Sequence, residues 1–197
     1  MNVPNKITVC RIILSVILLV LMVFPVEQIG INFPEITIGQ LIIDSKYLIC
    51  AVIFLIASTT DFLDGYLARK YNLVTDLGKV MDAIADKMLV NGVLIVLAYQ
   101  GLIPVIVPIV IVIRDTAVDA IKMVAGQKNG AVAASKAGKI KTACMMTGVT
   151  LLMFYDLPFS LINIYPAKVL VMIATILSVV SGVQYYIKNK KFLVDGK

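Results

Sequence analysis

Aspartates are the residues of this sequence whose type and spacing could carry chemistry. The chain has 12 acidic residues and no histidine, so acid–base or metal chemistry here depends on carboxylates. Asp61 and Asp64 lie three residues apart and Asp82 and Asp86 lie four apart, which places each pair on one face of a helix. Carboxylate oxygens are the ligands that hard cations such as Mg²⁺ or Mn²⁺ prefer. The four aspartates therefore predict a divalent-metal site.

The helices that carry these pairs must be neighbours for the carboxylates to converge. A short loop joins them, so they run antiparallel and both acidic faces lie near one end. Four ionised carboxylates would repel one another and be costly to desolvate, which divalent cations would resolve. The alternative is that they are ordinary helix-end charges solvated at an interface. Gly65 and Gly78 favour the metal site, because glycines let a ligand or a neighbouring helix approach closely.

The composition predicts that these helices lie in a membrane. Of the 197 residues 60% are hydrophobic and 15% charged, and the mean hydropathy is +0.96. A bilayer core of about 30 Å needs about 20 helical residues. Six apolar stretches have roughly that length, at residues 8–24, 47–68, 78–99, 103–125, 139–154 and 167–187. We expect an all-α integral membrane protein with six spans and a single membrane-embedded catalytic domain over residues 1–197. Residues 1–7 are expected at the interface and residues 188–197 in a cytoplasmic tail.

Basic residues predict the orientation of the spans. Of the 18 lysines and arginines, only Lys46 and Lys168 fall near the turns after the first, third and fifth spans. By the positive-inside rule both termini and the remaining turns are cytoplasmic, and so are the aspartates. The semi-polar segment 25–45 has strand-like patches and is expected on the outer surface. The net charge of +6 indicates an anionic leaflet or a phosphorylated substrate as partner rather than nucleic acid.

The aspartates belong to a longer pattern with eight defined positions. It reads Asp61-x-x-Asp64-Gly65-x-x-Ala68-Arg69, eight residues, Gly78-x-x-x-Asp82-x-x-x-Asp86. This pattern resembles the complete motif of the CDP-alcohol phosphotransferase family without a departure. The resemblance implies six transmembrane helices, a homodimer, a CDP-activated lipid substrate and two Mg²⁺ or Mn²⁺ ions.

Roles follow from this resemblance. Asp61, Asp64 and Asp82 would bind metal that bridges to the CDP diphosphate, and Asp86 would complete the site and act as the general base. Gly65, Ala68 and Gly78 would line the nucleotide pocket. Arg69 would join them, since a guanidinium offers a planar fork to a diphosphate.

The N-terminal residues resemble the bacterial branch of the family that makes phosphatidylglycerophosphate. They read Asn2-Val3-Pro4-Asn5-Lys6-Ile7-Thr8-Val9-Cys10-Arg11, against Asn-x-Pro-Asn-x-(Ile/Leu)-Thr-x-x-Arg. Asn5 and Thr8 would therefore join the CDP pocket. Pro4 and Asn5 suit a turn or a helix cap before the first span, and a cap alone would explain Asn5. Arg11 inside an apolar span is costly enough to require a partner.

A second group of cations predicts where a phosphorylated acceptor binds. Arg114 lies well inside the fourth span, and Ser135, Lys139 and Lys141 lie near the start of the fifth. Positive-inside topology is the alternative explanation for these cations, and it is the one we favour for Lys136. For Arg114 inside its span, and for Lys139 and Lys141 near a helix N-terminus, anion binding is at least as good an explanation.

The expected reaction transfers the phosphatidyl group of CDP-diacylglycerol to sn-glycerol 3-phosphate, giving phosphatidylglycerophosphate and cytidine monophosphate. Phosphatidylinositol-phosphate, phosphatidylserine and cardiolipin synthases are alternatives within the family. An intramembrane prenyltransferase or an ion or proton transporter are alternatives outside it. The transporter fits less well, because the sequence shows neither internal repeats nor interrupted helices.

Overall fold

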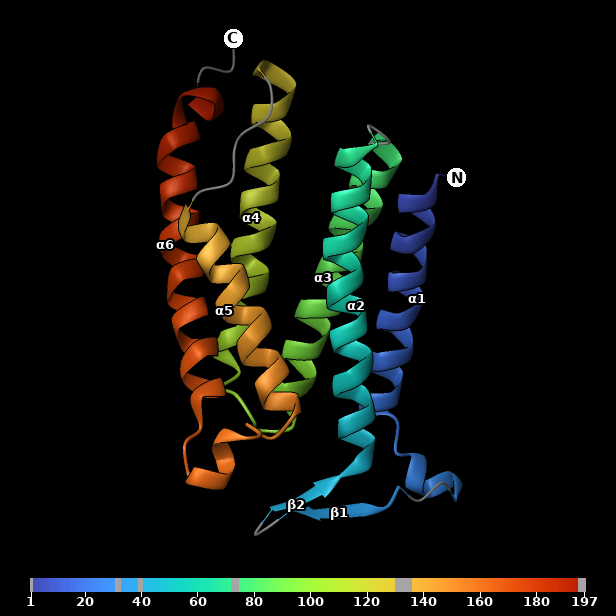
Figure 1. Cartoon of the computed structure of the whole chain (residues 1–197). Coiled ribbons are helices and arrows are strands. Elements are labelled where there is room, and N and C mark those ends of the chain that lie inside the picture. The colour runs from blue at the N-terminus through green and yellow to red at the C-terminus, as the bar shows by residue number, and fades with distance from the viewer. Residues whose placement is uncertain (1, 31–32, 39–40, 72–74, 130–135, 195–197) are drawn as a thin grey trace.

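The chain folds into a bundle of long helices with a small β-hairpin at one end (Figure 1). This computed structural model describes residues 2–30, 33–38, 41–71, 75–129 and 136–194. Within these residues the helices are α1 (Val3–Val23), α2 (Ser45–Lys70), α3 (Asp76–Tyr99), α4 (Ile106–Asn129), α5 (Lys136–Met153) and α6 (Pro166–Val194). The shorter elements are η1 (Val26–Ile29), β1 (Glu35–Ile38), β2 (Leu41–Asp44) and η2 (Phe159–Ile162).

The six helices coincide with the six apolar stretches of the sequence. Two of them, over Pro4–Val23 and Pro166–Lys190, are long and apolar enough to cross a membrane by length and composition alone. The other four carry the charged residues of the candidate site, apart from Arg11 of α1. The predicted helical fold is therefore confirmed, and the two apolar helices fit a membrane protein.

The helices form two groups of three that run side by side (Figure 1). In the first, α1 packs along both α2 and α3; in the second, α6 packs against α4 and α5. Contacts of α2 with α5 and of α3 with α4 join the groups. Both termini lie at the end of the bundle opposite the hairpin, so the chain crosses its length an even number of times.

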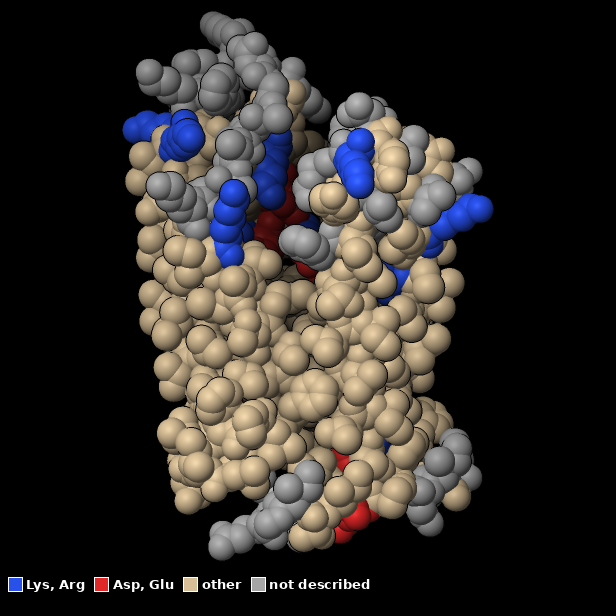
Figure 2. All heavy atoms as spheres, viewed as in Figure 1, with Lys and Arg blue, Asp and Glu red and all other residues tan. Residues whose placement is uncertain are grey.

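Apolar side chains occupy both the interior and the outer face of this bundle. Leu18, Phe54 and Val149 are fully buried, whereas Ile113 and Ile187 are each 65% exposed. Figure 2 shows lysines and arginines gathered toward the end that holds the termini, above an apolar middle. A lipid environment explains this surface, because lipid tails impose no penalty on exposed hydrocarbon.

The hairpin end contains the strands that the semi-polar segment predicted. Glu35 pairs with Asp44 and Ile38 with Leu41 in an antiparallel ladder. At the start of α2 the buried Lys46 donates to the carbonyl oxygen of Phe24 at 3.1 Å. This cation holds the end of α1 to the start of α2, and it lies at the end where the sequence placed it.

The start of α1 differs from the expectation for Pro4 and Asn5. The helix already begins at Val3, so both residues lie in its first turn rather than in a preceding turn or cap. Proline is tolerated there because the amide groups of a first helical turn lack intrahelical partners. Asn2 occupies the cap position and makes no side-chain capping hydrogen bond.

Candidate active site

Two of the predicted metal-binding aspartates meet at a buried arginine. The Arg11 Nη1 atom forms an ion pair with Asp61 Oδ1, and Nη2 lies 3.1 Å from Asp82 Oδ1. The Arg11 side chain is completely buried, whereas those of Asp61 and Asp82 are 41% and 53% exposed. The two carboxylates thus converge from α2 and α3 and remain accessible on the side away from α1.

The rest of the α2 motif is placed by its backbone. Asp64, Ala68 and Arg69 all lie in α2, and their side chains are outside the part of the chain that the structure describes. Gly65 follows Asp64 in the same helix and is half-buried. Since α2 is continuous through these positions, Asp61 and Asp64 share one helix face, as predicted.

Carboxylate oxygens from two helices are a donor set that fits Mg²⁺ or Mn²⁺. Among the described side chains, no group of three or more histidines, cysteines or carboxylates is close enough to hold a metal ion. Asp61 and Asp82 converge here, and Asp86, although described, does not form a group of three with them. A centre made of all four aspartates would need Asp64 from α2 and a closer approach of Asp86 from α3.

The first turn of α1 is pinned to the first turn of α3. Asn5 Nδ2 donates to Thr75 Oγ1 at 3.1 Å, and the same hydroxyl oxygen caps α3 by accepting from the Gly78 amide at 3.0 Å. A Cβ atom at Gly78 would lie 2.6 Å from Asn5 Oδ1. Gly78 therefore allows the close approach of a neighbouring helix. Thr8, one turn on, is buried and donates to the Pro4 carbonyl at 3.1 Å.

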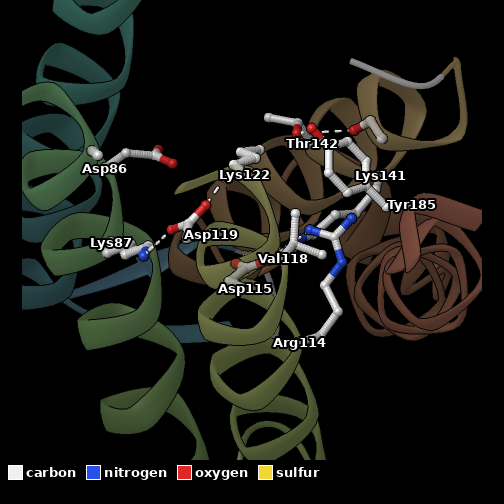
Figure 3. Close-up of a pocket in the computed structure, with 12 residues that line it drawn as sticks. Asp86, Lys87, Arg114, Asp115, Val118, Asp119, Lys122, Lys141, Thr142 and Tyr185 are labelled. Carbon is white, nitrogen blue, oxygen red and sulfur yellow. Dashed lines mark hydrogen bonds and ion pairs between the residues drawn. The ribbon is translucent and has the colours of Figure 1, made fainter. Parts of the chain in front are cut away.

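Asp86 faces a second centre, a cavity of about 280 Å³ between α3, α4, α5 and α6 (Figure 3). Its charged and hydroxyl-bearing lining residues are Asp86, Lys87, Arg114, Asp115, Asp119, Lys122, Lys141, Thr142 and Tyr185. Arg114 and Lys141, predicted to bind an acceptor phosphate, therefore lie around one cavity with the predicted general base. Asp82, which contacts Arg11, lies one helical turn before Asp86 on α3.

The cations of the cavity are held in place by hydrogen bonds. Arg114 donates from Nε to the Ser178 carbonyl at 3.0 Å and from Nη2 to Ser181 Oγ at 2.7 Å. A Cβ at Gly182 would lie 3.0 Å from Arg114 Cγ, so this glycine gives the arginine room to lie across α6. Asp115 Oδ1 accepts from Arg114 at 2.8 Å and from Lys141 at 2.7 Å. One carboxylate thus holds two cations near the cavity wall.

Four charged residues of the cavity, Lys87, Asp115, Asp119 and Lys122, were not predicted as site residues. Asp119 forms an ion pair with Lys87 of α3 and another, at 3.3 Å, with Lys122 of α4. The i,i+3 spacing of Asp119 and Lys122 was visible in the sequence, but a pair of this kind is common on solvated helix faces. Only the packing of α3 against α4 brings Lys87 to them.

The cavity also has a polar group that lacks a partner. Tyr185 of α6 is 6% exposed, and its hydroxyl has no hydrogen-bond partner within the described structure. An unsatisfied buried hydroxyl is unfavourable, so a ligand oxygen in the cavity would stabilise it.

The remaining predicted acceptor residues lie elsewhere. Lys139 is exposed and is not among the residues that line the cavity, although Lys141 two positions later is. Residues two apart point to different sides of a helix, which explains the difference. Ser135 lies outside the described residues, and so does the side chain of Lys136.

A helical bundle with an acidic centre beside a basic cavity suits an enzyme that acts on phosphorylated substrates, and comparison with known proteins identifies its family. The family model described as CDP-alcohol phosphatidyltransferase matches residues 1–182. This chain belongs to the CDP-alcohol phosphatidyltransferase family, and the resemblance seen in its aspartate motif is confirmed.

Individual relatives carry a more specific name. A CDP-diacylglycerol–glycerol-3-phosphate 3-phosphatidyltransferase of Bacillus subtilis (strain 168) is 40% identical over 188 residues, 95% of each chain. An enzyme of the same name from Rickettsia felis is 31% identical over 192 residues, 97% of each chain. Another, from Mycoplasma genitalium, is 37% identical over 152 residues, 75% of this chain and 63% of its own.

Proposed function

We propose that this protein transfers the phosphatidyl group of CDP-diacylglycerol to sn-glycerol 3-phosphate. The observation that carries the proposal is the cavity in which Asp86 shares the lining with Arg114 and Lys141. A base and two cations around one space suit an acceptor that has both a hydroxyl and a phosphate. The names of the full-length relatives support the same substrates.

The acceptor enters the cavity with its phosphate toward the cations. Arg114 and Lys141 bind the phosphate oxygens by charge-assisted hydrogen bonds, and Asp115 keeps both side chains in place. The primary hydroxyl of the glycerol then points toward Asp86. This arrangement converts an encounter of two substrates into a reaction between positioned groups.

Asp86 acts as the general base. It accepts the proton of the attacking hydroxyl as the oxygen forms a bond to the phosphatidyl phosphorus. The bond from that phosphorus to the bridging oxygen breaks, and cytidine monophosphate leaves with the electron pair. Asp61, Asp64, Asp82 and Asp86 would hold Mg²⁺ or Mn²⁺, two ions in our proposal. When bound, such ions neutralise the diphosphate and stabilise the leaving group.

The nucleotide is placed on the first group of helices. Gly65, Ala68 and Arg69 of α2 are proposed to line its pocket, with Gly78 of α3. Asn5 and Thr8, both buried, are proposed to support the pocket from α1.

We further propose six membrane spans in the plasma membrane of a bacterium, with both termini and the site at the cytoplasmic face. The exposed apolar side chains along the bundle and the basic residues at the end with the termini support this orientation. A homodimer is expected from the family.

The test follows cytidine monophosphate release by purified protein in detergent with CDP-diacylglycerol and Mg²⁺ or Mn²⁺. Glycerol 3-phosphate, inositol phosphate, serine and no acceptor are compared, with Asp86→Asn as the inactive control. Release that needs glycerol 3-phosphate and is lost in the variant is the expected result. Dependence on another acceptor would keep the family and overturn the substrate. No release from folded protein with any acceptor would point to a transport or prenyl-diphosphate function.

A further inference from the structure

Arg11 is a fully buried cation that the proposed reaction does not use. We infer that it is a positioning residue, which holds the Asp61 and Asp82 carboxylates together before any divalent ion binds. What this role of Arg11 means for metal binding rests on the proposed function of these aspartates. The effect of Arg11 on the stability of the metal-free protein is independent of that function.

The first argument is the geometry of the guanidinium. Arg11 contacts Asp61 through Nη1 and Asp82 through Nη2, so its two terminal nitrogens bind carboxylates of two different helices. A planar fork with fixed donor directions suits this task better than the single point charge of a lysine ammonium. The guanidinium therefore sets the separation of the two carboxylates as well as balancing their charge.

The second argument is the packing of the helices. α1 packs along both α2 and α3, whereas α2 and α3 contact each other at few points. The two aspartates thus depend on α1 for their relative position. Without a cation between them, the Asp61 and Asp82 carboxylates would repel each other and favour separation of α2 and α3.

The third argument is that α1 cannot slide easily past α3. Asn5 lies six residues before Arg11 on α1. It donates to Thr75 at 3.1 Å and packs against Gly78 of α3. Two contacts along one helix pair fix its axial position. The packing of α1 against α3 therefore places Arg11 beside Asp82.

A cycle of substitutions tests the inference without relying on activity. The thermal midpoint is measured in detergent with EDTA for four proteins: wild type, Arg11→Met, Asp61→Asn/Asp82→Asn, and all three substitutions together. With Arg11 present, the two aspartate substitutions leave a buried cation without a counter-charge and lower the midpoint by about 5 °C or more. In the Arg11→Met background the same neutralisation removes a repulsion and raises the midpoint.

Lys46→Met is the matched control, because Lys46 is also a buried cation but lies at the hairpin end of the bundle. It is expected to lower the midpoint while the aspartate substitutions remain destabilising in its background. Equal effects of the aspartate substitutions in the wild-type and Arg11→Met backgrounds would overturn the inference. If Arg11→Met does not fold, Arg11→Lys replaces it; the inference then requires the aspartate substitutions to be at most half as destabilising as in wild type.

Adding Mn²⁺ separates this inference from the proposed function. A positioning role predicts that Mn²⁺ raises the midpoint of Arg11→Met more than that of the wild type, since the ion replaces the missing cation. If Mn²⁺ shifts neither midpoint, the proposed metal site is wrong. The sign of the aspartate effect in EDTA still decides the role of Arg11.

Discussion

The two charged centres of this protein have opposite designs. Around Arg11, one cation is shared by two carboxylates, Asp61 and Asp82, from different helices. Around Asp115, one carboxylate is shared by two cations, Arg114 and Lys141. The first arrangement leaves negative charge uncompensated and the second leaves positive charge. The comparison therefore predicts a cation-binding centre and an anion-binding centre within one bundle.

This difference also separates the substrates. A diphosphate that needs metal belongs at the acidic centre, and a free phosphate ester belongs at the basic one. Asp86 lies between them, one helical turn from Asp82 and on the lining of the basic cavity. Each of the following changes should affect one centre and spare the other.

Metal removal should have the largest effect and should act on the acidic centre alone. Treatment with EDTA is expected to lower the rate of cytidine monophosphate release by about 1,000-fold or more, because phosphoryl transfer needs its charge neutralised. Mn²⁺ or Mg²⁺ should restore it. Lys141→Met should need the same Mn²⁺ concentration for half-maximal rate as the wild type. A large shift in that concentration would show that the centres are not independent.

Loss of a buried cation should affect the basic cavity selectively. Lys141→Met is expected to raise the KM for glycerol 3-phosphate by about 30-fold, the value of one charge-assisted hydrogen bond. The KM for CDP-diacylglycerol should not change. Lys139→Met, on the exposed side of α5, should change the acceptor KM less than about threefold. Equal effects of the two substitutions would mean that the acceptor does not bind in the cavity.

A methyl group at Gly78 should disturb the acidic centre through α1. Gly78→Ala places a Cβ at 2.6 Å from Asn5 Oδ1 and 2.9 Å from Thr75 Oγ1, so these side chains must move and the hydrogen bond between α1 and Thr75 is disturbed. We expect the free energy of unfolding to fall by about 1–3 kcal/mol. Gly126→Ala is the control, since a Cβ there meets nothing within 4 Å. Thermal unfolding in detergent measures both, and equal midpoints would refute the tight contact.

The smallest effect is expected at Tyr185. Tyr185→Phe removes a buried hydroxyl that has no hydrogen-bond partner in the described structure, so stability should be unchanged or higher by about 1 kcal/mol. The KM for glycerol 3-phosphate should rise a few-fold, by about the value of one neutral hydrogen bond. Reduced stability with an unchanged acceptor KM would show that the hydroxyl serves the fold rather than the ligand.

Much of the site was predictable because its spacing is local. The helical repeat alone puts Asp61 with Asp64 and Asp82 with Asp86, and continuous helices through these positions confirm it. The same repeat explains the different positions of Lys139 and Lys141. Sequence reasoning also showed that Arg11 needed a partner, since an unpaired cation in an apolar helix is costly.

The sequence by itself determined which residues share a helix face, which stretches are apolar and which motif they carry. Only the tertiary structure decided which faces meet. Arg11 is separated from Asp61 by 50 residues and from Asp82 by 71, and Lys87 of α3 meets Asp119 of α4 through helix packing rather than through any repeat. Helical periodicity is a property of neighbouring residues, whereas these ion pairs depend on how six helices pack. That packing turns one cation among carboxylates and one carboxylate among cations into two different binding centres.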